Sequence, residues 1–241
     1  MRRVNPQVRH RALVTGGAVR VGRAIALGLA DAGFDVAIAY HRSGDSARDT
    51  VRELRRRGAT AIALRANLRD AAAARRLVSR AARALGGLDV LVNSAAGFAR
   101  TPLASATPGR WNALLDVNLR APFLCTQAAA ARMRAGGHVV NVADAWARTA
   151  PPGWSAYAAS KAGLEMLTRV LAAELRVRGI AVNAAAPGPV LKPPGLPPGR
   201  WRAITRGRSV RLADVVAAVV RLATCPPAVT GRIRTVAARR A

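Results

Sequence analysis

The chain has 241 residues, of which 51% are hydrophobic and only 4% aromatic, a composition that excludes a disordered chain and suits one domain with a single sizeable core. Its formal net charge of +27 would by itself attract nucleic acid. Because the arginines are spread from end to end and form no run, a nucleic-acid partner is not expected.

The two cysteines, Cys125 and Cys225, lie far apart, which argues against a disulfide framework and a cysteine-based metal site. The basic extension at residues 1–10 is followed by a strand-like run, without a signal-type apolar region, and no apolar run reaches 18 residues. We therefore expect a cytoplasmic protein with no membrane contact and no bound metal.

Seven short apolar runs alternate with longer stretches that suit amphipathic helices. Runs that are apolar at successive positions are typical of strands buried on both faces, and their alternation with helices indicates a covered parallel sheet. The expected fold is a single α/β domain with a doubly wound parallel sheet of the Rossmann type. The expected strands are 12–16, 35–40, 60–66, 88–93, 137–143, 180–187 and 232–237.

The first expected strand runs into a glycine-rich loop, TGGAVRVG, at residues 15–22. Glycine permits a positive φ and a close backbone approach, and the helix that follows offers free N–H groups to a pyrophosphate. The loop is therefore predicted to bind a dinucleotide, and the predicted contacts in it are Thr15, Gly16, Arg20, Val21 and Gly22.

After the second expected strand the chain reads His41, Arg42 and Ser43, where NAD-dependent proteins carry an acidic residue for the ribose 2′-hydroxyl. A carboxylate would repel a 2′-phosphate, whereas an arginine and a serine hydroxyl bind one. We expect Arg42 and Arg20 to hold this phosphate together, so that the cofactor is NADPH.

Tyr157 and Lys161 are four residues apart in SAYAASKAG (155–163), which places them on one face of a helix. A nearby ammonium lowers the pKa of a phenol, so Tyr157 is expected to exchange a proton with a carbonyl oxygen near neutral pH. The proline- and glycine-rich stretch 187–200 predicts an irregular loop beyond the strand ends, within a substrate loop region at 187–210.

The glycine loop with Arg20 in its middle glycine position resembles that of the short-chain dehydrogenase/reductase family. The segments LVNSAAGF (91–98), DVNLRAPF (116–123) and NVADAW (141–146) extend the resemblance over nearly the whole chain. It implies that Asn118 holds a lysine-linked water and that Tyr157 supplies a proton. The further cofactor contacts that it implies are Asn67, Leu68, Asn93, Ala95, Pro187 and Gly188.

Position 144 is an aspartate where most of the family has serine, and in this respect the chain resembles pteridine reductases. The resemblance implies that Asp144 and Tyr157 share proton delivery, while Phe98 and the nicotinamide enclose the substrate ring. The favoured substrate is then a pterin-like C=N group, as in a dihydropterin or dihydrofolate. The alternatives are a generic carbonyl or 3-oxoacyl reductase, and a catalytically silent nucleotide- or nucleic-acid-binding protein.

The same resemblance implies a homo-oligomer, either a dimer or a tetramer. The helix that contains Tyr157 and the helix before it are expected to pack against their symmetry mates. The apolar residues expected to make that contact are Ala128, Ala129, Ala130, Leu164, Leu167 and Leu171.

Overall fold

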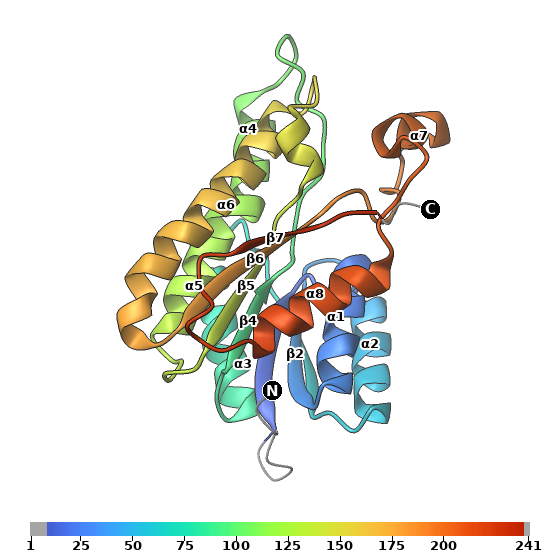
Figure 1. The fold of residues 1–241 in the computed structure, drawn as a ribbon. Coiled ribbons are helices and arrows are strands. Elements are labelled where there is room, and N and C mark those ends of the chain that lie inside the picture. The colour runs from blue at the N-terminus through green and yellow to red at the C-terminus, as the bar shows by residue number, and fades with distance from the viewer. Residues whose placement is uncertain (1–8, 239–241) are drawn as a thin grey trace.

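Seven parallel strands form one sheet in the order β3-β2-β1-β4-β5-β6-β7 (Figure 1). The computed structural model describes residues 9–238. Each expected strand is present and overlaps its predicted range, so the doubly wound α/β fold is confirmed. The strands are β1 (His10–Thr15), β2 (Phe34–Tyr40), β3 (Ala61–Arg65), β4 (Val90–Asn93), β5 (His138–Val142), β6 (Ala181–Pro187) and β7 (Ile233–Val236).

Helices cover both faces of the sheet (Figure 1). On one face α1 contacts both α2 and α8, and on the other α5 lies between α3 and α6. No helix in residues 9–238 is long and apolar enough to span a membrane. The helices are α1 (Arg20–Asp31), α2 (Gly44–Arg56), α3 (Ala71–Leu85), α4 (Pro108–Leu115), the π-helix η1 (Asp116–Arg120), α5 (Ala121–Ala130), the short η2 (Trp146–Thr149), α6 (Ser155–Leu175), the short η3 (Arg176–Arg178), α7 (Pro198–Thr205) and α8 (Leu212–Thr224).

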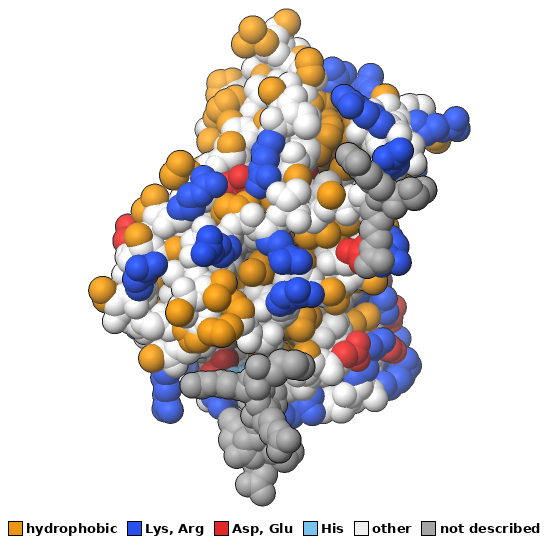
Figure 2. Space-filling view, viewed as in Figure 1, with side chains coloured by type: hydrophobic (Ala, Val, Ile, Leu, Met, Phe, Trp, Pro, Cys, Tyr) orange, Lys and Arg blue, Asp and Glu red, His pale blue; other side chains and the backbone are white. Residues whose placement is uncertain are grey.

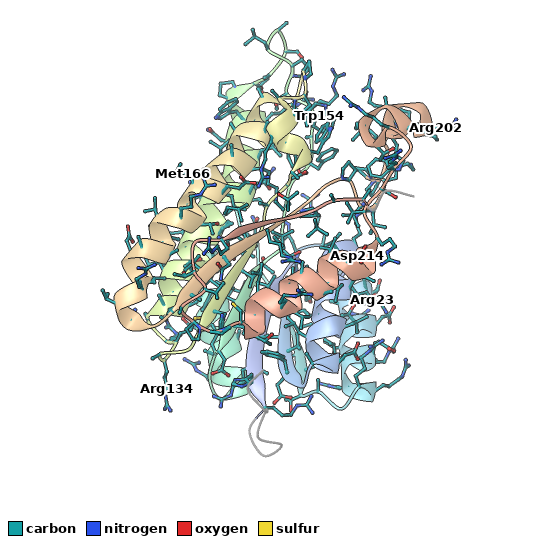
Figure 3. All side chains as sticks on the ribbon, in the orientation of Figure 1. Arg23, Arg134, Trp154, Met166, Arg202 and Asp214 are labelled. Carbon is teal, nitrogen blue, oxygen red and sulfur yellow. The ribbon has the colours of Figure 1, made fainter. Side chains whose placement is uncertain are left out.

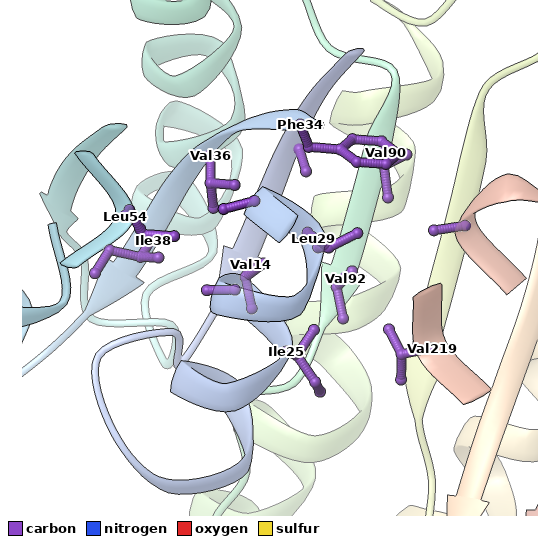
Figure 4. Packing of buried hydrophobic residues seen from close by; sticks show 14 of the residues in the cluster. Val14, Ile25, Leu29, Phe34, Val36, Ile38, Leu54, Val90, Val92 and Val219 are labelled. Carbon is purple, nitrogen blue, oxygen red and sulfur yellow. The ribbon is translucent and has the colours of Figure 1, made fainter. Parts of the chain in front are cut away.

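Strand β1 shows why both faces of the sheet are covered. Val14 belongs to the core cluster that faces α1, α2 and α8, whereas the preceding Leu13 belongs to the cluster on the opposite face. Figure 4 shows the first cluster, in which Ile25 and Leu29 of α1 pack near Val14. Because successive strand side chains alternate between faces, an unbroken apolar run is buried on both sides.

The strand order changes direction between β1 and β4, which opens a crevice at the carboxyl ends of these two strands. Thr15 is the last residue of β1, and it lies in register with Asn93, the last residue of β4. The glycine loop leaves β1 at this point, and the segment 94–98 leaves β4 beside it. The crevice is therefore the place where these two segments meet.

A buried chain of polar side chains links the sheet to α6. The Asn93 amide donates to Asn141 on β5 at 2.9 Å, and the Asn141 amide donates to the Thr168 hydroxyl on α6, also at 2.9 Å. Thr168 in turn donates to the carbonyl of Leu164 at 2.7 Å. Because buried polar groups are costly unless they are paired, this chain fixes α6 against the strands.

The stretch 187–200 is irregular only in part. Residues 188–197 contain no helix or strand, but Pro187 ends β6 and α7 begins at Pro198, so the prediction of an irregular loop was wrong for residues 187 and 198–200. Proline is tolerated in the first turn of a helix because an N–H group there has no partner within the helix.

Replacing Thr168 with valine keeps the shape but removes the acceptor for Asn141, so we expect the free energy of unfolding to fall by about 1–3 kcal/mol. Urea unfolding measures the change. Thr224→Val is the matched control, because Thr224 also donates to the carbonyl four residues before it but lies on the exposed end of α8. Equal losses in the two variants would show that the buried chain adds nothing.

Candidate active site

The glycine loop is shaped by two close backbone contacts. A Cβ added to Gly16, which has φ +66°, would lie 2.9 Å from the Cα of Ala95, and one added to Gly22 would lie 2.2 Å from the Gly16 carbonyl oxygen. The Thr15 hydroxyl accepts from the backbone N–H groups of Ser94 and Ala95 at 3.0 and 3.1 Å. One cradle at the head of α1 is therefore formed by the predicted contacts Thr15, Gly16, Gly22 and Ala95. A ligand could come close to the protein backbone there.

Arg20 occupies a left-handed backbone conformation with φ +55°, which explains why glycine is usual at this position. Its guanidinium donates to the carbonyls of Leu191 and Lys192 at 2.9 and 3.1 Å. The structure thus differs from the expectation that Arg20 and Arg42 converge on one phosphate. The left-handed backbone carries the Arg20 side chain across to the 188–197 segment, where two carbonyls accept from it.

The residues after β2 are open to solvent. His41 and Arg42 are exposed and Ser43 is half-buried, and no carboxylate in the described part of the chain pairs with Arg42. Arg65 donates to the His41 carbonyl at 3.2 Å, which fixes the backbone of this turn. Arg42 is thus an accessible cation, since the nearby Asp45 pairs with Arg48, and such a cation matches the chemistry that a ribose 2′-phosphate requires.

The remaining predicted cofactor contacts lie at the same edge of the sheet, although some of their groups are already engaged. Asn67 accepts from the backbone N–H of Arg69 at 3.2 Å, and Leu68 and Val21 are partly buried against the core. The Pro187 carbonyl accepts from the N–H of Ala145 at 2.9 Å, while the N–H of Gly188 donates to Val236 at 3.0 Å. The end of β6 is thereby joined to the segment that follows β5.

Asp144 and Tyr157 are in direct contact. The Tyr157 hydroxyl donates to one oxygen of the Asp144 carboxyl group, and the backbone N–H of Trp146 donates to the other at 2.8 Å. Burial raises the pKa of Asp144 above its ordinary 3.8, although the Tyr157 hydrogen bond and the Lys161 charge partly oppose this. Burial, together with the Asp144 charge, raises the pKa of Tyr157 well above its ordinary value.

Lys161 is buried one turn further along α6, and its ammonium group donates to the Val142 carbonyl at 2.8 Å. Burial lowers the pKa of Lys161 to about 8, although the Asp144 charge opposes the shift. The expected lowering of the Tyr157 pKa by Lys161 was wrong, since burial and the adjoining carboxylate dominate. At neutral pH the phenol therefore keeps its proton.

Asn118 lies in the π-helix η1, and its amide is fully engaged. The amide oxygen accepts from the N–H of Gly97 at 2.7 Å, while the amide nitrogen donates to the Gly97 carbonyl and the Ser160 hydroxyl, both at 3.0 Å. The side chain therefore joins the segment after β4 to α6. A π-helical turn displaces the usual backbone hydrogen bonds, so the predicted water contact would fall to the backbone of Asn118.

Three aromatic rings, those of Phe98, Trp146 and Trp154, gather around the ring of Tyr157. Phe98 packs against Trp154 with ring centroids 4.3 Å apart and meets Tyr157 edge-on at 4.8 Å. Trp146 lies 6.3 Å from the Tyr157 ring. The enclosure of a substrate ring by Phe98 stays a prediction, because in this structure Phe98 supports Trp154 and Tyr157. The sequence analysis did not name Trp146 and Trp154 as site residues. Their closeness in sequence to Asp144 and Tyr157, in a chain with few aromatic residues, was a signal that could have found them.

A cavity of about 700 Å³ adjoins this aromatic group. Trp146 and Trp154 form one wall, Gly188 and Pro189 lie at the end of β6, and α7 forms the opposite side. Figure 3 shows Trp154 before α6 and Arg202 on α7, on either side of this space. The cavity is large enough for a small molecule, and although Asp144 and Tyr157 do not line it, their neighbours Ala145, Trp146 and Trp154 do.

The helix faces expected to bind a second copy are buried in the chain's own core. Ala129 is fully buried, and Leu164 and Leu171 are 1% and 6% exposed, because α5 and α6 pack on the sheet and on each other. The predicted contact residues Ala128, Ala129, Ala130, Leu164 and Leu171 were therefore wrong, and Leu167 is only partly buried. The exposed apolar residues of the same two helices are Phe123, Met166 and Val170.

Comparison with known proteins gives four consistent matches. Residues 10–194 match the family model described as short chain dehydrogenase. A 3-oxoacyl-[acyl-carrier-protein] reductase FabG from Staphylococcus aureus (strain Mu50) is 37% identical over 179 residues, which are 73% of this chain and 73% of that protein. A short chain dehydrogenase from Burkholderia cenocepacia J2315, crystallised with NADP, has a TM-score of 0.91 and 37% identity and covers 97% of this chain and 98% of its own. A metagenomic blue fluorescent protein crystallised with NADPH has a TM-score of 0.88 and 36% identity, covering 95% and 96%.

The buried carboxyl group makes stability depend on pH. The pKa of Asp144 in the folded protein is raised above its ordinary 3.8, so the unfolded chain loses this proton at a lower pH than the folded protein does. The free energy of unfolding therefore falls as the pH rises from the unfolded pKa through the folded pKa. Asparagine does not titrate, so the free energy of unfolding of Asp144→Asn should increase relative to wild type between pH 4.5 and pH 7. Urea unfolding at both pH values measures the difference, and a difference independent of pH would contradict the assignment.

Proposed function

The chain belongs to the short-chain dehydrogenase family, and from this premise we propose that it is an NADPH-dependent reductase that converts the ketone of a 3-oxoacyl thioester to an alcohol. The observation that carries the proposal is the buried hydroxyl of Tyr157, which is held by Asp144 one helical turn from Lys161. The names of the curated relatives support the thioester, because acyl-carrier-protein reductases from Staphylococcus aureus and Synechocystis are each 37% identical to this chain over 179 residues.

The cradle at the head of α1 suits a dinucleotide cofactor. A Cβ at Gly16 or Gly22 would collide with the backbone of Ala95 or of Gly16, so these glycines let the loop fold tightly at the head of α1, where free N–H groups would hold a pyrophosphate. Arg42 and Ser43 would hold the 2′-phosphate, and the two neighbours crystallised with NADP or NADPH support this preference. When bound, NADPH supplies the hydride that reduces the substrate carbon.

Tyr157 would deliver the proton to the substrate oxygen. Its raised pKa keeps the phenol protonated at neutral pH, which is the state that a donor requires. The ammonium of Lys161, held by the Val142 carbonyl, would stabilise the negative charge left on Tyr157. Asp144, whose pKa is raised by burial, would return a proton to Tyr157 when it is itself protonated.

A second candidate is the reduction of a pterin-like C=N group. Asp144 favours this candidate, because a carboxyl group can accept a hydrogen bond from a ring N–H and, when protonated, donate one. Phe98, which meets Tyr157 edge-on, supports it if its ring also contacts the substrate. The curated relatives favour the thioester, which is why the pterin is the second candidate.

The proposed enzyme is a homo-oligomer. Phe123 on α5 and Met166 and Val170 on α6 line one apolar groove and are each between 39% and 56% exposed. An exposed apolar face of this kind is typical of a subunit contact. We assign the contact to these three residues, in place of the buried alanines and leucines.

Arg42→Ala tests the cofactor assignment. Wild type should prefer NADPH over NADH at least tenfold in kcat/KM, since a charge-assisted contact contributes about 1.5–3 kcal/mol, and the variant should lose most of this preference. Arg52→Ala is the control, because Arg52 pairs with Asp49 on the exposed side of α2. Equal use of NADH and NADPH by the unmutated enzyme would defeat the assignment.

A substrate panel with NADPH tests the reaction. We expect kcat/KM for acetoacetyl-pantetheine to exceed that for a dihydropterin by about tenfold or more, which corresponds to about 1.4 kcal/mol. Asp144→Ser should retain measurable thioester reduction, because the serine hydroxyl can still hydrogen-bond to the ketone oxygen. Rapid dihydropterin turnover that Asp144→Ser abolishes, with little thioester turnover, would establish the second candidate instead.

A further inference from the structure

One arginine near the reactive residues joins three elements of the fold. Arg148 lies in η2, the short helix that begins two residues after Asp144. Its Nε donates to both carboxyl oxygens of Glu165 on α6, at 3.0 and 3.1 Å, and its Nη2 lies 2.8 Å from one of them. Its Nη1 donates to the hydroxyl of Thr235 on β7 at 2.9 Å. The guanidinium group therefore ties η2 to both α6 and β7.

Positive charge by itself singles out no arginine in this chain. Figure 2 shows Lys and Arg side chains scattered over the visible face, and the chain has 39 of them against 12 acidic residues. The ion pairs of α2, such as that of Arg52 with Asp49, join two largely exposed side chains of the same helix. By contrast, the side chain of Glu165 is only 11% exposed, and a buried carboxylate is costly unless it is paired. Arg148 therefore compensates a charge that α6 carries into the interior.

Residues 144–149 are fixed to neighbouring elements on both sides of the Asp144 contact. On one side, the N–H of Ala145 donates to the Pro187 carbonyl at 2.9 Å, which joins the stretch to β6. On the other side, Arg148 joins it to α6. Between these two points the N–H of Trp146 donates to the Asp144 carboxyl group at 2.8 Å. The place of that N–H group therefore depends on how firmly η2 is held.

We propose that Arg148 and Glu165 are positioning residues for the Asp144 carboxyl group. Their ion pair holds η2 so that the N–H of Trp146 stays directed at one oxygen of Asp144, which leaves the other oxygen to accept from Tyr157. The inference rests on the proposed function for its effect on turnover, whereas the state of Asp144 can be followed without a substrate.

The pKa of Asp144 reports on the contact from η2. Burial raises this pKa, and the hydrogen bonds from the N–H groups of Trp146 and Ala147 oppose the rise. The titratable groups that face the carboxyl group come from α6; they are Tyr157 and Lys161, and both also oppose the rise. If η2 moves away, hydrogen bonds that favour the charged form are lost, so the pKa of Asp144 rises further.

Two variants that remove opposite charges provide the test: Arg148→Gln and Glu165→Gln. If the pair acts by positioning, both variants free η2, and both raise the pKa of Asp144 by about one unit, which corresponds to about 1.4 kcal/mol. If the two residues act only through their charges, Glu165→Gln should instead lower this pKa, because a negative charge that opposes ionisation is removed. NMR titration of the protein with carboxyl-labelled aspartate measures the pKa, and Asp144→Asn identifies the signal.

Arg57→Gln is the matched control. Arg57 also pairs with two carboxylates, those of Asp31 on α1 and Glu53 on α2. Its side chain is 34% exposed, against 39% for Arg148. Arg57 follows α2 directly and precedes β3, so it lies at the edge of the sheet where the strands begin, opposite the site. The control variant should leave the pKa of Asp144 unchanged.

Exchange of the two charges, in the double variant Arg148→Glu, Glu165→Arg, restores an ion pair between η2 and α6 and should return the pKa of Asp144 towards the wild-type value. Arg148→Lys serves where a glutamine variant does not fold. It keeps the charge but lacks the planar fork that holds both carboxyl oxygens, so it should still raise the pKa above the wild-type value. A lowered pKa in Glu165→Gln, or an unchanged pKa in every folded variant of the pair, would overturn the inference.

Turnover separates this inference from the proposed function. In the reduction of acetoacetyl-pantetheine, both glutamine variants should lower kcat by about tenfold while the Kd for NADPH changes little, because the partner of Tyr157 is no longer held in place. If the wild type does not reduce the thioester, the proposed function fails, and the NMR titration still decides the positioning role. A raised pKa in both glutamine variants then supports that role, and an unchanged pKa overturns it.

Discussion

The hydrogen bond from Tyr157 to Asp144 is the interaction on which the site depends. It joins a phenol and a carboxyl group that are both largely removed from water, and burial raises the pKa of each. In this setting the phenol remains protonated at neutral pH, and the pKa of the carboxyl group is higher than that of an ordinary aspartate. In the reaction proposed here, the pair would provide a short route by which a proton reaches a substrate oxygen and is replaced.

The rest of the fold keeps this pair in place through buried polar contacts. The amide of Asn118 joins Gly97 to Ser160 on α6, and the chain from Asn93 through Asn141 to Thr168 attaches α6 to the sheet. The glycine loop lies at the same edge of the sheet because the strand order reverses between β1 and β4. The topology of the sheet thus brings the glycine loop and Tyr157 to the same edge, and hydrogen bonds then fix their positions.

The sequence predicts well what depends on periodicity and on local backbone chemistry. The strands follow from unbroken apolar runs, and the glycine loop follows from positions where a Cβ would collide with the backbone. The direction of long side chains is not encoded in this way, so the contact of Arg20 with the loop at Leu191 was missed. Helix α5 is apolar on most sides, so its pattern did not show that Phe123 is exposed while Ala129 is buried. Likewise, the spacing of Tyr157 and Lys161 puts them on one face of α6 but does not reveal that burial and the Asp144 charge raise the pKa of the Tyr157 phenol.

The central claim is that Tyr157 gives its proton to the substrate. Single-turnover reduction of an acetoacetyl thioester by Tyr157→Phe, with NADPH oxidation followed by stopped flow, tests this claim most directly. Phenylalanine keeps the ring within its aromatic surroundings but removes the proton, so the rate should fall by about a hundredfold or more while the Kd for NADPH changes little. A rate equal to that of the wild type, with the thioester still reduced, would contradict the account.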